Sequence, residues 1–305
     1  MRVVATAGHV DHGKSSLVEA LTGTNPDRLE EEQSRGMTID LGFAHATLPS
    51  GAGISFIDVP GHVRFLGNML AGVGGVDACM FVVDAAEGWK PQSEEHLRIL
   101  ELVGLTHGIV ALTKSDLVDG EWCQLQELDI RDRLDGSFLA DAPIVPVSAT
   151  TGDGLDELRA ALDSLVQHTP GALDRGRPRL WVDRVFAAKG SGTVVTGTLT
   201  GGALRTDQQV SIAMRDVRVR AVQSHGRSQG SIGPGNRVAL NLAGVDHTEL
   251  RRGDAVVLRE QWRPTSRFDA SLYVLEGLRH QVTRRGAYLA YIGSGEFPVR
   301  VRVLG

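Results

Sequence analysis

A glycine-rich loop that ends in lysine and serine is the segment of the chain with the clearest chemistry. Residues 8–15 read GHVDHGKS, follow the apolar run 3–7 and precede a helical pattern over 16–21. Backbone NH groups of such a loop point inward at phosphates, its lysine can reach the β and γ phosphates, and its serine hydroxyl can bind magnesium. The segment predicts a nucleotide site made of Gly8, His9, Val10, Asp11, His12, Gly13, Lys14, Ser15 and Ser16.

Two further segments supply groups for the γ phosphate and for a magnesium ion. Thr38, in RGMTID, has a hydroxyl that can bind magnesium and a backbone NH that can reach the γ phosphate. Asp58 and Gly61 lie in DVPGH, directly after the apolar stretch 54–57. At the end of a strand Asp58 can hold the magnesium shell through water, while Gly61 approaches the γ phosphate. We therefore predict that Ser15, Thr38 and Asp58 hold the metal.

The last two segments indicate which base the site takes. TKSD (113–116) follows an apolar strand, and the carboxylate of Asp116 can accept both NH groups of the guanine edge, which selects guanine over adenine. SAT (148–150) follows another apolar strand and can donate a backbone NH to the guanine carbonyl oxygen. The predicted ligand is GTP or GDP with Mg²⁺. The predicted base contacts are Thr113, Lys114, Asp116, Ser148, Ala149 and Thr150.

Alternating strand and helix patterns position these segments. Apolar strands over 3–7, 54–59, 78–84, 108–112 and 144–147, closed by a helix over 154–167, predict a doubly wound α/β sheet. Ligand loops of such a fold lie at the carboxyl ends of its strands. We assign this P-loop GTPase domain to residues 1–168. Residues 169–179 contain glycines and prolines that break both periodicities, and we interpret them as a linker.

The second part of the chain is predicted to be all β. Apolar and arginine side chains alternate over 217–221, and repeated glycine turns predict a β-barrel over 180–262. A further β segment, 263–305, is too short to close a barrel alone. The predicted fold class is therefore α/β plus β: a P-loop GTPase domain, a β-barrel and part of a second β-barrel. We expect the chain to be a piece of a longer protein.

The charge is divided unevenly along the chain. Residues 1–170 contain 11 Lys and Arg against 26 Asp and Glu, a formal charge of −15, whereas residues 171–305 contain 21 against 11, a charge of +10. A basic module beside an acidic nucleotide domain suggests contact with a polyanion such as RNA. Scattered arginines on exposed strands are the alternative interpretation of any single position.

Composition limits the other classes of function. No apolar run approaches the 18 or so residues of a membrane span, and the first residues read as a strand rather than a signal peptide. Cys79 and Cys123 lack metal-site spacing; we expect Cys79 in the core and both thiols reduced. These features predict a monomer in the cytoplasm, without membrane contact.

Several strings resemble the translational GTPase family. GHVDHGKS, RGMTID and DVPGH match its loop and its two switch segments, and the match covers nearly the whole chain. Within that family the chain resembles the selenocysteine-specific elongation factors, through RGMTIDLGFA (35–44), FLGNMLAGVGGVD (65–77), ALTKSD (111–116) and DRVFAAKGSGTVVTGTL (183–199). The resemblance implies a GTPase that works in protein biosynthesis and selenocysteine incorporation.

The same resemblance implies a mechanism. His62 would orient the water that attacks the γ phosphate, and Val10 and Met37 would flank it as a hydrophobic gate; a histidine capping a local turn, and two packing residues, are the alternatives. A GTPase without an arginine finger of its own turns over slowly, at roughly 10⁻⁴ to 10⁻² per second. The implied activating partner is the ribosome.

A second implied site recognises the aminoacyl group of selenocysteinyl-tRNA. By resemblance, Arg184 and Arg237 would face the selenolate and Asp183 would accept from the α-amino group. A selenol is ionised at neutral pH and a serine hydroxyl is not, so a desolvated arginine can distinguish them. The alternative is an ordinary ion pair on the barrel surface.

The sequence departs from the pattern of these families at two points. Thr113 stands where most GTPases have asparagine, which puts the usual amide bridge between base and loop in doubt. The region that binds a messenger hairpin in bacterial relatives is expected to lie outside this chain.

Two other families are alternative interpretations of the same sequence. They are a GTP-dependent regulatory subunit of sulfate activation, which binds no tRNA, and the gamma subunit of the factor that carries initiator tRNA. The zinc-knuckle cysteines of the latter are absent from this sequence.

Overall fold

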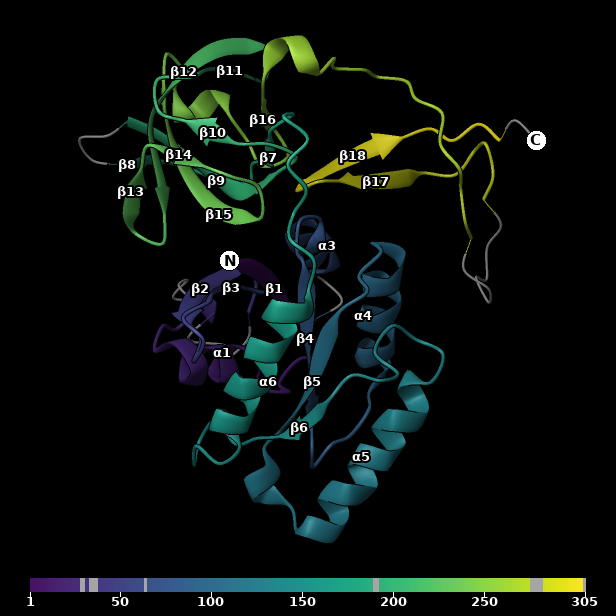
Figure 1. Cartoon of the computed structure of the whole chain (residues 1–305). Coiled ribbons are helices and arrows are strands. Elements are labelled where there is room, and N and C mark those ends of the chain that lie inside the picture. The colour runs from purple at the N-terminus through teal and green to yellow at the C-terminus, as the bar shows by residue number, and fades with distance from the viewer. Residues whose placement is uncertain (28–30, 33–37, 63–64, 189–191, 275–281, 304–305) are drawn as a thin grey trace.

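The computed structural model describes residues 1–27, 31–32, 38–62, 65–188, 192–274 and 282–303. An α/β domain lies below a β-barrel, and a β-hairpin lies beside the barrel (Figure 1). In the part of the chain with described coordinates, no helix is both long and apolar enough to cross a membrane.

A six-stranded sheet forms the centre of the α/β domain. Its strands are β1 (Arg2–Ala7), β2 (Gly42–Thr47), β3 (Gly53–Asp58), β4 (Ala78–Asp84), β5 (Gly108–Thr113) and β6 (Ile144–Pro146), in the order β2-β3-β1-β4-β5-β6. All neighbours pair in parallel except β2 and β3. The sequence analysis missed β2, because this antiparallel edge strand has an exposed His45 and lacks the continuous apolar run of the buried strands.

Helices cover both faces of this sheet, as a doubly wound fold requires. They are α1 (Lys14–Thr22), α3 (Leu66–Val73), α4 (Pro91–Leu102), α5 (Gly120–Leu134) and α6 (Leu155–His168). One apolar cluster joins α1 and α6 to the sheet, and a second joins α3, α4 and α5. Cys79 belongs to the second cluster and is fully buried, as expected. The loops after β1, β3 and β5 therefore meet at one edge of the sheet.

Six strands close the barrel. They are β7 (Arg179–Trp181), β9 (Gly192–Thr200), β11 (Gln209–Ile212), β12 (Arg215–Ser224), β15 (Asn236–Ala243) and β16 (Ala255–Val257), in the cyclic order β11-β16-β7-β9-β15-β12. Inward side chains form one apolar core. Two further strands pair with the barrel strands: β8 (Arg184–Ala188) with β9, and β13 (Arg227–Gln229) with β12. Strands β10 (Leu204–Arg205) and β14 (Ser231–Ile232) form a separate two-stranded sheet.

The alternation that predicted the barrel holds only as far as a bulge. Val217 and Val219 are buried, while Arg218 and Arg220 are exposed. The register with β15 then shifts between Val219 and Ala221, so that Ala221 is half-buried and Val222 enters the core. A bulge moves the following side chains to the other face; the prediction that Ala221 faces inward with the valines was wrong in this respect.

The last described strands form a hairpin of β17 (Tyr288–Ile292) and β18 (Gly295–Val299). It packs against α3, where a Cβ built on Gly74 would lie 3.0 Å from the carbonyl oxygen of Gly293. Three short 3₁₀ helices complete the described elements: η2 (Ser115–Leu117), η3 (His247–Glu249) and η4 (Arg259–Gln261).

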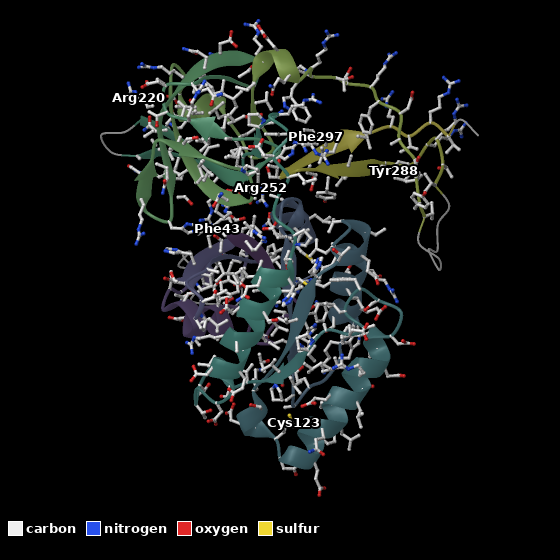
Figure 2. The ribbon with its side chains drawn as sticks, in the orientation of Figure 1. Phe43, Cys123, Arg220, Arg252, Tyr288 and Phe297 are labelled. Atoms are coloured by element: carbon white, nitrogen blue, oxygen red, sulfur yellow. The ribbon has the colours of Figure 1, made fainter. Side chains whose placement is uncertain are left out.

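Arg252 connects the barrel to the segment that follows Thr38. Its guanidinium donates to the carboxylate of Asp40 and to the side-chain oxygen of Asn68, each at 3.0 Å. Asn68 in turn donates to the carbonyl oxygen of Ile39 at 2.7 Å. Arg252 and Phe43 both lie at the junction of the two domains (Figure 2). The barrel is thus hydrogen-bonded to the segment of Thr38, which was predicted to approach the γ phosphate, and to helix α3.

Candidate functional site: nucleotide loop and domain junction

The glycine-rich loop joins β1 to α1, and its lysine points back into it. Lys14 is buried, and its ammonium donates to the carbonyl oxygens of Gly8 and His9 at 3.1 and 2.5 Å. Gly13 has a φ of 82°, which glycine adopts without strain, and directly precedes the first turn of α1. The free backbone NH groups of a helix start favour an anion. The loop therefore has the shape and polarity of a phosphate cradle.

Gly61 lies against this cradle and needs to be glycine. A Cβ at this position would come within 2.5 Å of the Lys14 ammonium nitrogen and 2.6 Å of the backbone nitrogen of Val10. Contacts below 3.0 Å with backbone force a shift of the chain. The segment predicted to approach the γ phosphate is thus in contact with the phosphate loop.

The three predicted metal ligands converge on one point. The Ser15 hydroxyl lies 2.7 Å from the Thr38 hydroxyl and donates to the Asp58 carboxylate at 2.7 Å. The other carboxylate oxygen of Asp58 accepts from the Thr6 hydroxyl at 2.6 Å, and the Thr38 hydroxyl also donates to Asp27 at 2.9 Å. Hydroxyl and carboxylate oxygens are the donors that Mg²⁺ prefers. These residues fit a magnesium ion.

Burial shifts the ionisation of the two charged groups in the cradle. Burial is the main cause that lowers the pKa of Lys14 to about 8, although Asp58 opposes the shift. Burial likewise raises the pKa of Asp58 to about 6, against the hydrogen bonds from Thr6 and Ser15. Negative charge from a polyphosphate would favour the charged lysine. The site is therefore electrostatically suited to an anionic ligand.

Thr113 preserves a bridge between the base-binding segment and the loop. Its buried hydroxyl lies 2.7 Å from the carbonyl oxygen of His12 and 3.1 Å from that of Val83, and can donate to one of them at a time. The nearby Lys114 forms an ion pair with the buried Asp84 at 2.6 Å. The Thr113 hydroxyl thus takes the place of the asparagine amide that most GTPases have at this position. It contacts the backbone of the phosphate loop.

The remaining residues that were predicted to contact the base lie at the same sheet edge. Asp116 is exposed within η2, after β5. Ser148 is buried after β6, and its hydroxyl accepts the backbone NH groups of Thr150 and Thr151 at 3.2 and 3.1 Å. These bonds form a tight turn that includes Ala149. The carboxylate and the turn come from neighbouring strands, as recognition of one base edge requires.

Replacing Thr113 by valine is expected to loosen the loop. The variant keeps the volume but leaves a buried carbonyl oxygen without this donor, which costs about 1–3 kcal/mol. Since that loss falls on the cradle, we expect GDP affinity to fall by roughly 5- to 150-fold. Titration with a fluorescent GDP analogue measures it, with Thr113→Ser as the matched control that keeps the hydroxyl. Equal affinities of the two variants would refute the bridge.

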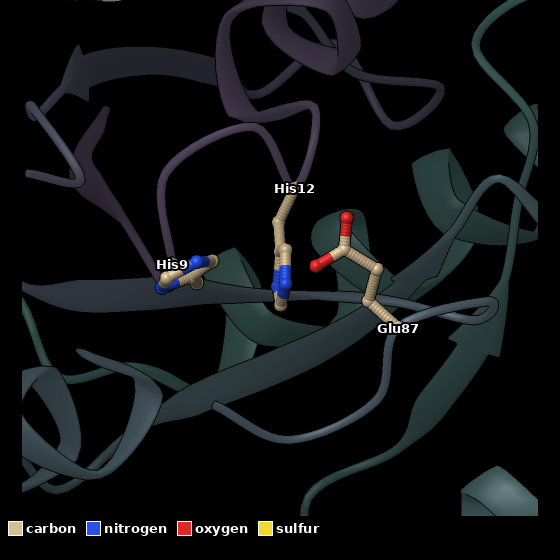
Figure 3. A group of neighbouring side chains, drawn as sticks. All are labelled: His9, His12 and Glu87. Carbon is tan, nitrogen blue, oxygen red and sulfur yellow. The ribbon is translucent and has the colours of Figure 1, made fainter. Parts of the chain in front are cut away.

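Three side chains beside the loop have the composition of a metal site. His9, His12 and Glu87 place their ligand atoms within 4.8 Å of one another (Figure 3). However, the backbone NH of Asp84 donates to Nδ1 of His12 at 3.2 Å, so the ring proton of a neutral His12 is on Nε2 and no lone pair points at the cluster. Burial and the positive charge of Lys14 lower the pKa of both histidines. We interpret them as neutral supports of the loop.

Sequence analysis missed two supports of the loop, both on α4. His96 accepts the backbone NH of Gly8 at 3.0 Å, and Gln92 accepts that of Val10 at 3.2 Å. Burial lowers the pKa of His96 to about 3, so this side chain is a neutral acceptor. Polar side chains on the face of α4 that packs on the sheet could have indicated these contacts from the sequence.

The predicted hydrolytic residues are only partly described. His62 is half-buried at the loop after β3, and its ring lies 6.1 Å from that of Phe65. Val10 is half-buried in the phosphate loop. Met37 lies outside the described residues. The hydrophobic gate stays a prediction.

The three predicted aminoacyl-pocket residues come together at the junction of barrel and α/β domain. Arg237 forms an ion pair with Asp183, whose other oxygen accepts from the Thr196 hydroxyl at 2.7 Å. The guanidinium carbons of Arg184 and Arg237 lie 4.6 and 4.0 Å from the ring centroid of Phe43. Arg184 also donates to the carbonyl oxygen of Leu41. Asp183 and Arg237 thus form an ion pair, while Arg184 reaches across to the other domain.

A cavity of about 300 Å³ opens beside these arginines. Phe43, Arg184 and Arg237 line it, together with a histidine pair from the two domains, His45 and His225. The rings of this pair lie 4.7 Å apart, and burial lowers the pKa of His225 to about 4. Sequence analysis quoted Phe43 within a motif without giving it a role, because nothing local indicates which side chains meet across a domain junction.

The sheet, the glycine-rich loop after β1 and the TKSD segment after β5 are the arrangement of a P-loop GTPase, here with an attached β-barrel. The family of the elongation factor Tu GTP binding domain matches residues 1–168. Elongation factor Tu 2 of Streptomyces avermitilis is 34% identical over 322 residues, a match that covers 97% of this chain and 80% of that protein. The chain therefore belongs to the elongation factor Tu family of translational GTPases.

Selenocysteine-specific factors are similar over most of the chain. That of Desulfomicrobium baculatum is 44% identical over 298 residues, covering 96% of this chain and 47% of that protein. The crystal structure of a bacterial selenocysteine-specific elongation factor has a TM-score of 0.89 and 35% identity, covering 99% of this chain and 51% of that one. The predicted fold class and resemblance are confirmed. The chain spans less than half the length of the curated selenocysteine-specific relatives from three bacteria.

Proposed function

We propose that this chain is the GTP- and aminoacyl-tRNA-binding part of a selenocysteine-specific elongation factor. It binds GTP, carries selenocysteinyl-tRNA to the ribosome and hydrolyses GTP to GDP there. The observation that carries the proposal is the pair of guanidinium groups, Arg184 and Arg237, on the ring of Phe43 at the domain junction. A regulatory subunit without tRNA has no need for this desolvated positive charge.

In the proposed nucleotide complex, the loop NH groups and Lys14 hold the phosphates, and Asp116 accepts from the guanine edge. Ser15, Thr38 and Asp58 would hold a magnesium ion, which neutralises phosphate charge when bound. His62 orients the attacking water, and Val10 and Met37 keep it away until the ribosome acts. The division into residues 1–168, 169–179, 180–262 and 263–305 belongs to the same proposal, as does a cytoplasmic monomer.

The proposed selectivity for selenocysteine over serine depends on the negative charge of the selenolate. A selenolate at the Phe43 ring would accept charge-assisted hydrogen bonds, worth about 1.5–3 kcal/mol each. Two such bonds correspond to a preference of roughly 10²- to 10⁴-fold over the neutral serine hydroxyl. Asp183 accepts from the α-amino group, but it also holds Arg237. Arg184 is the better probe of selectivity, since replacing Arg237 would also remove the ion-pair partner of the buried Asp183.

The test compares the same tRNA carrying selenocysteine or serine. GTP-loaded protein is titrated with each, and the titration is repeated with Arg184→Ala. We expect a preference for selenocysteine of roughly 10²- to 10⁴-fold that falls by roughly 10- to 10²-fold in the variant, because one of the two bonds is lost, with GTP affinity unchanged. Equal binding of both tRNAs by the unmodified protein would refute the assignment. Failure to bind any aminoacyl-tRNA would favour the sulfate-activation alternative.

A further inference from the structure

A second cleft, between the linker and Trp262, gathers positive charge around a tryptophan. It has a volume of about 360 Å³ and is lined by the linker arginines Arg175, Arg177 and Arg179 together with Trp262. The guanidinium carbons of Arg177 and Arg179 lie 4.7 and 4.6 Å from the ring centroid of Trp262. Stacking on a ring fixes a guanidinium. One NH group of Arg177 donates to the carbonyl oxygen of Gln261, which leaves its other NH groups for an acceptor.

Within the described part of the chain, no carboxylate neutralises the charge of this cleft. Among the residues that the structure describes, none of the three arginines forms an ion pair with a carboxylate. The Nε of Arg179 and the Nε1 of Trp262 are buried and have no hydrogen-bond partner there. Burial, with the charge of Arg177 as a second cause, lowers the pKa of Arg179. Buried donors without acceptors are costly, and an anion would supply the acceptors.

The linker backbone holds the cleft in shape. The backbone NH groups of Arg175 and Arg177 donate to the carbonyl oxygen of Gly201 at 3.0 and 2.8 Å. From the other side, Gln261 in η4 donates to the carbonyl oxygen of Gly176 at 2.9 Å. The donors are therefore positioned before any ligand arrives, which reduces the entropy cost of binding.

We propose that Arg175, Arg177, Arg179 and Trp262 form a binding cleft for the phosphodiester backbone of an RNA, separate from the aminoacyl pocket. Three guanidinium groups at alternate positions of one segment suit a row of phosphates better than a single ion. The +10 formal charge of residues 171–305 favours the same ligand. The inference rests on the proposed function, since the RNA is the tRNA that the chain carries.

The test is the salt dependence of RNA binding. Fluorescein-labelled selenocysteinyl-tRNA is titrated into the GTP-loaded chain between 50 and 200 mM KCl. Each lost phosphate contact lowers the slope of log affinity against log salt by about 0.7–0.9. For Arg177→Gln with Arg179→Gln we expect the slope to fall by roughly 1–2 and binding at 50 mM to weaken about 10-fold. Arg218→Gln with Arg220→Gln removes the same charge from exposed positions of β12 and is the matched control.

Each outcome of the salt titration either supports or overturns the proposed cleft. Arg177→Lys with Arg179→Lys keeps the charge and should retain the slope, which guards against misfolding of the glutamine pair. A slope unchanged in the glutamine pair, or lowered equally in the control, would overturn the cleft alone. Displacement of the RNA by millimolar inorganic phosphate at constant ionic strength would assign the cleft to small anions instead. If the unmodified chain binds no tRNA, the proposed function fails together with the cleft.

Discussion

Gly8→Ala is expected to destabilise the chain by about 4 kcal/mol or more. The φ of Gly8 is 130°, a conformation that alanine rarely adopts, and its built Cβ would lie 2.1 Å from the carbonyl oxygen of Val82. That oxygen belongs to β4, which pairs with β1, so the overlap can be relieved only by separating two central strands. The backbone NH of Gly8 would also move away from His96. Urea unfolding without nucleotide measures the loss.

Gly23→Ala is the matched control for this effect. Gly23 also has a positive φ, 71°, but a Cβ there meets nothing within 4 Å. The backbone strain alone costs about 1 kcal/mol. The difference between the two variants isolates the steric contact at the root of the phosphate loop. If both variants lose the same free energy of unfolding, the close approach of Gly8 to β4 does not contribute to the loss in Gly8→Ala.

The places of the predicted phosphate and base segments at the ends of their strands could be predicted because each segment is local. The loop, its lysine and the strand ends before Asp58 and Asp116 follow from runs of a few residues, and parallel topology brings strand ends together. The structure also explained the one local departure, since Thr113 reaches the loop backbone through its hydroxyl. A sequence pattern indicates which element a residue occupies, and a doubly wound sheet then determines its neighbours.

The junction between domains was not predictable in the same way. Phe43, on a short edge strand, contacts two arginines that lie about 140 and 190 residues further along the chain. The bulge in β12 likewise depends on pairing with β15 rather than on its own alternation. The cleft at Trp262 combines the linker with a residue beyond the barrel strands. Such contacts depend on how units pack, which no local periodicity encodes.

Arg237→Ala is expected to cost about 3–5 kcal/mol of folding stability before any effect on tRNA appears. The side chains of Arg237 and Asp183 are only 12% and 6% exposed. Removing the arginine leaves a buried carboxylate with Thr196 as its remaining described hydrogen-bond donor. An unpaired buried charge is far more costly than a missing pair. The prediction is checked by thermal and urea unfolding of the variant beside Arg184→Ala, which should lose no more than about 1.5 kcal/mol.

A double variant separates the contribution of this ion pair to folding stability from the proposed role of Arg237 in recognising selenocysteine. Asp183→Asn with Arg237→Met removes both charges and keeps comparable volumes, so it should recover at least about 2 kcal/mol relative to Arg237→Ala. If the double variant is no more stable than the single one, the buried carboxylate is not the source of the loss. A stable double variant without selenocysteine preference would assign Arg237 to recognition as well as to folding, because stability would no longer limit binding.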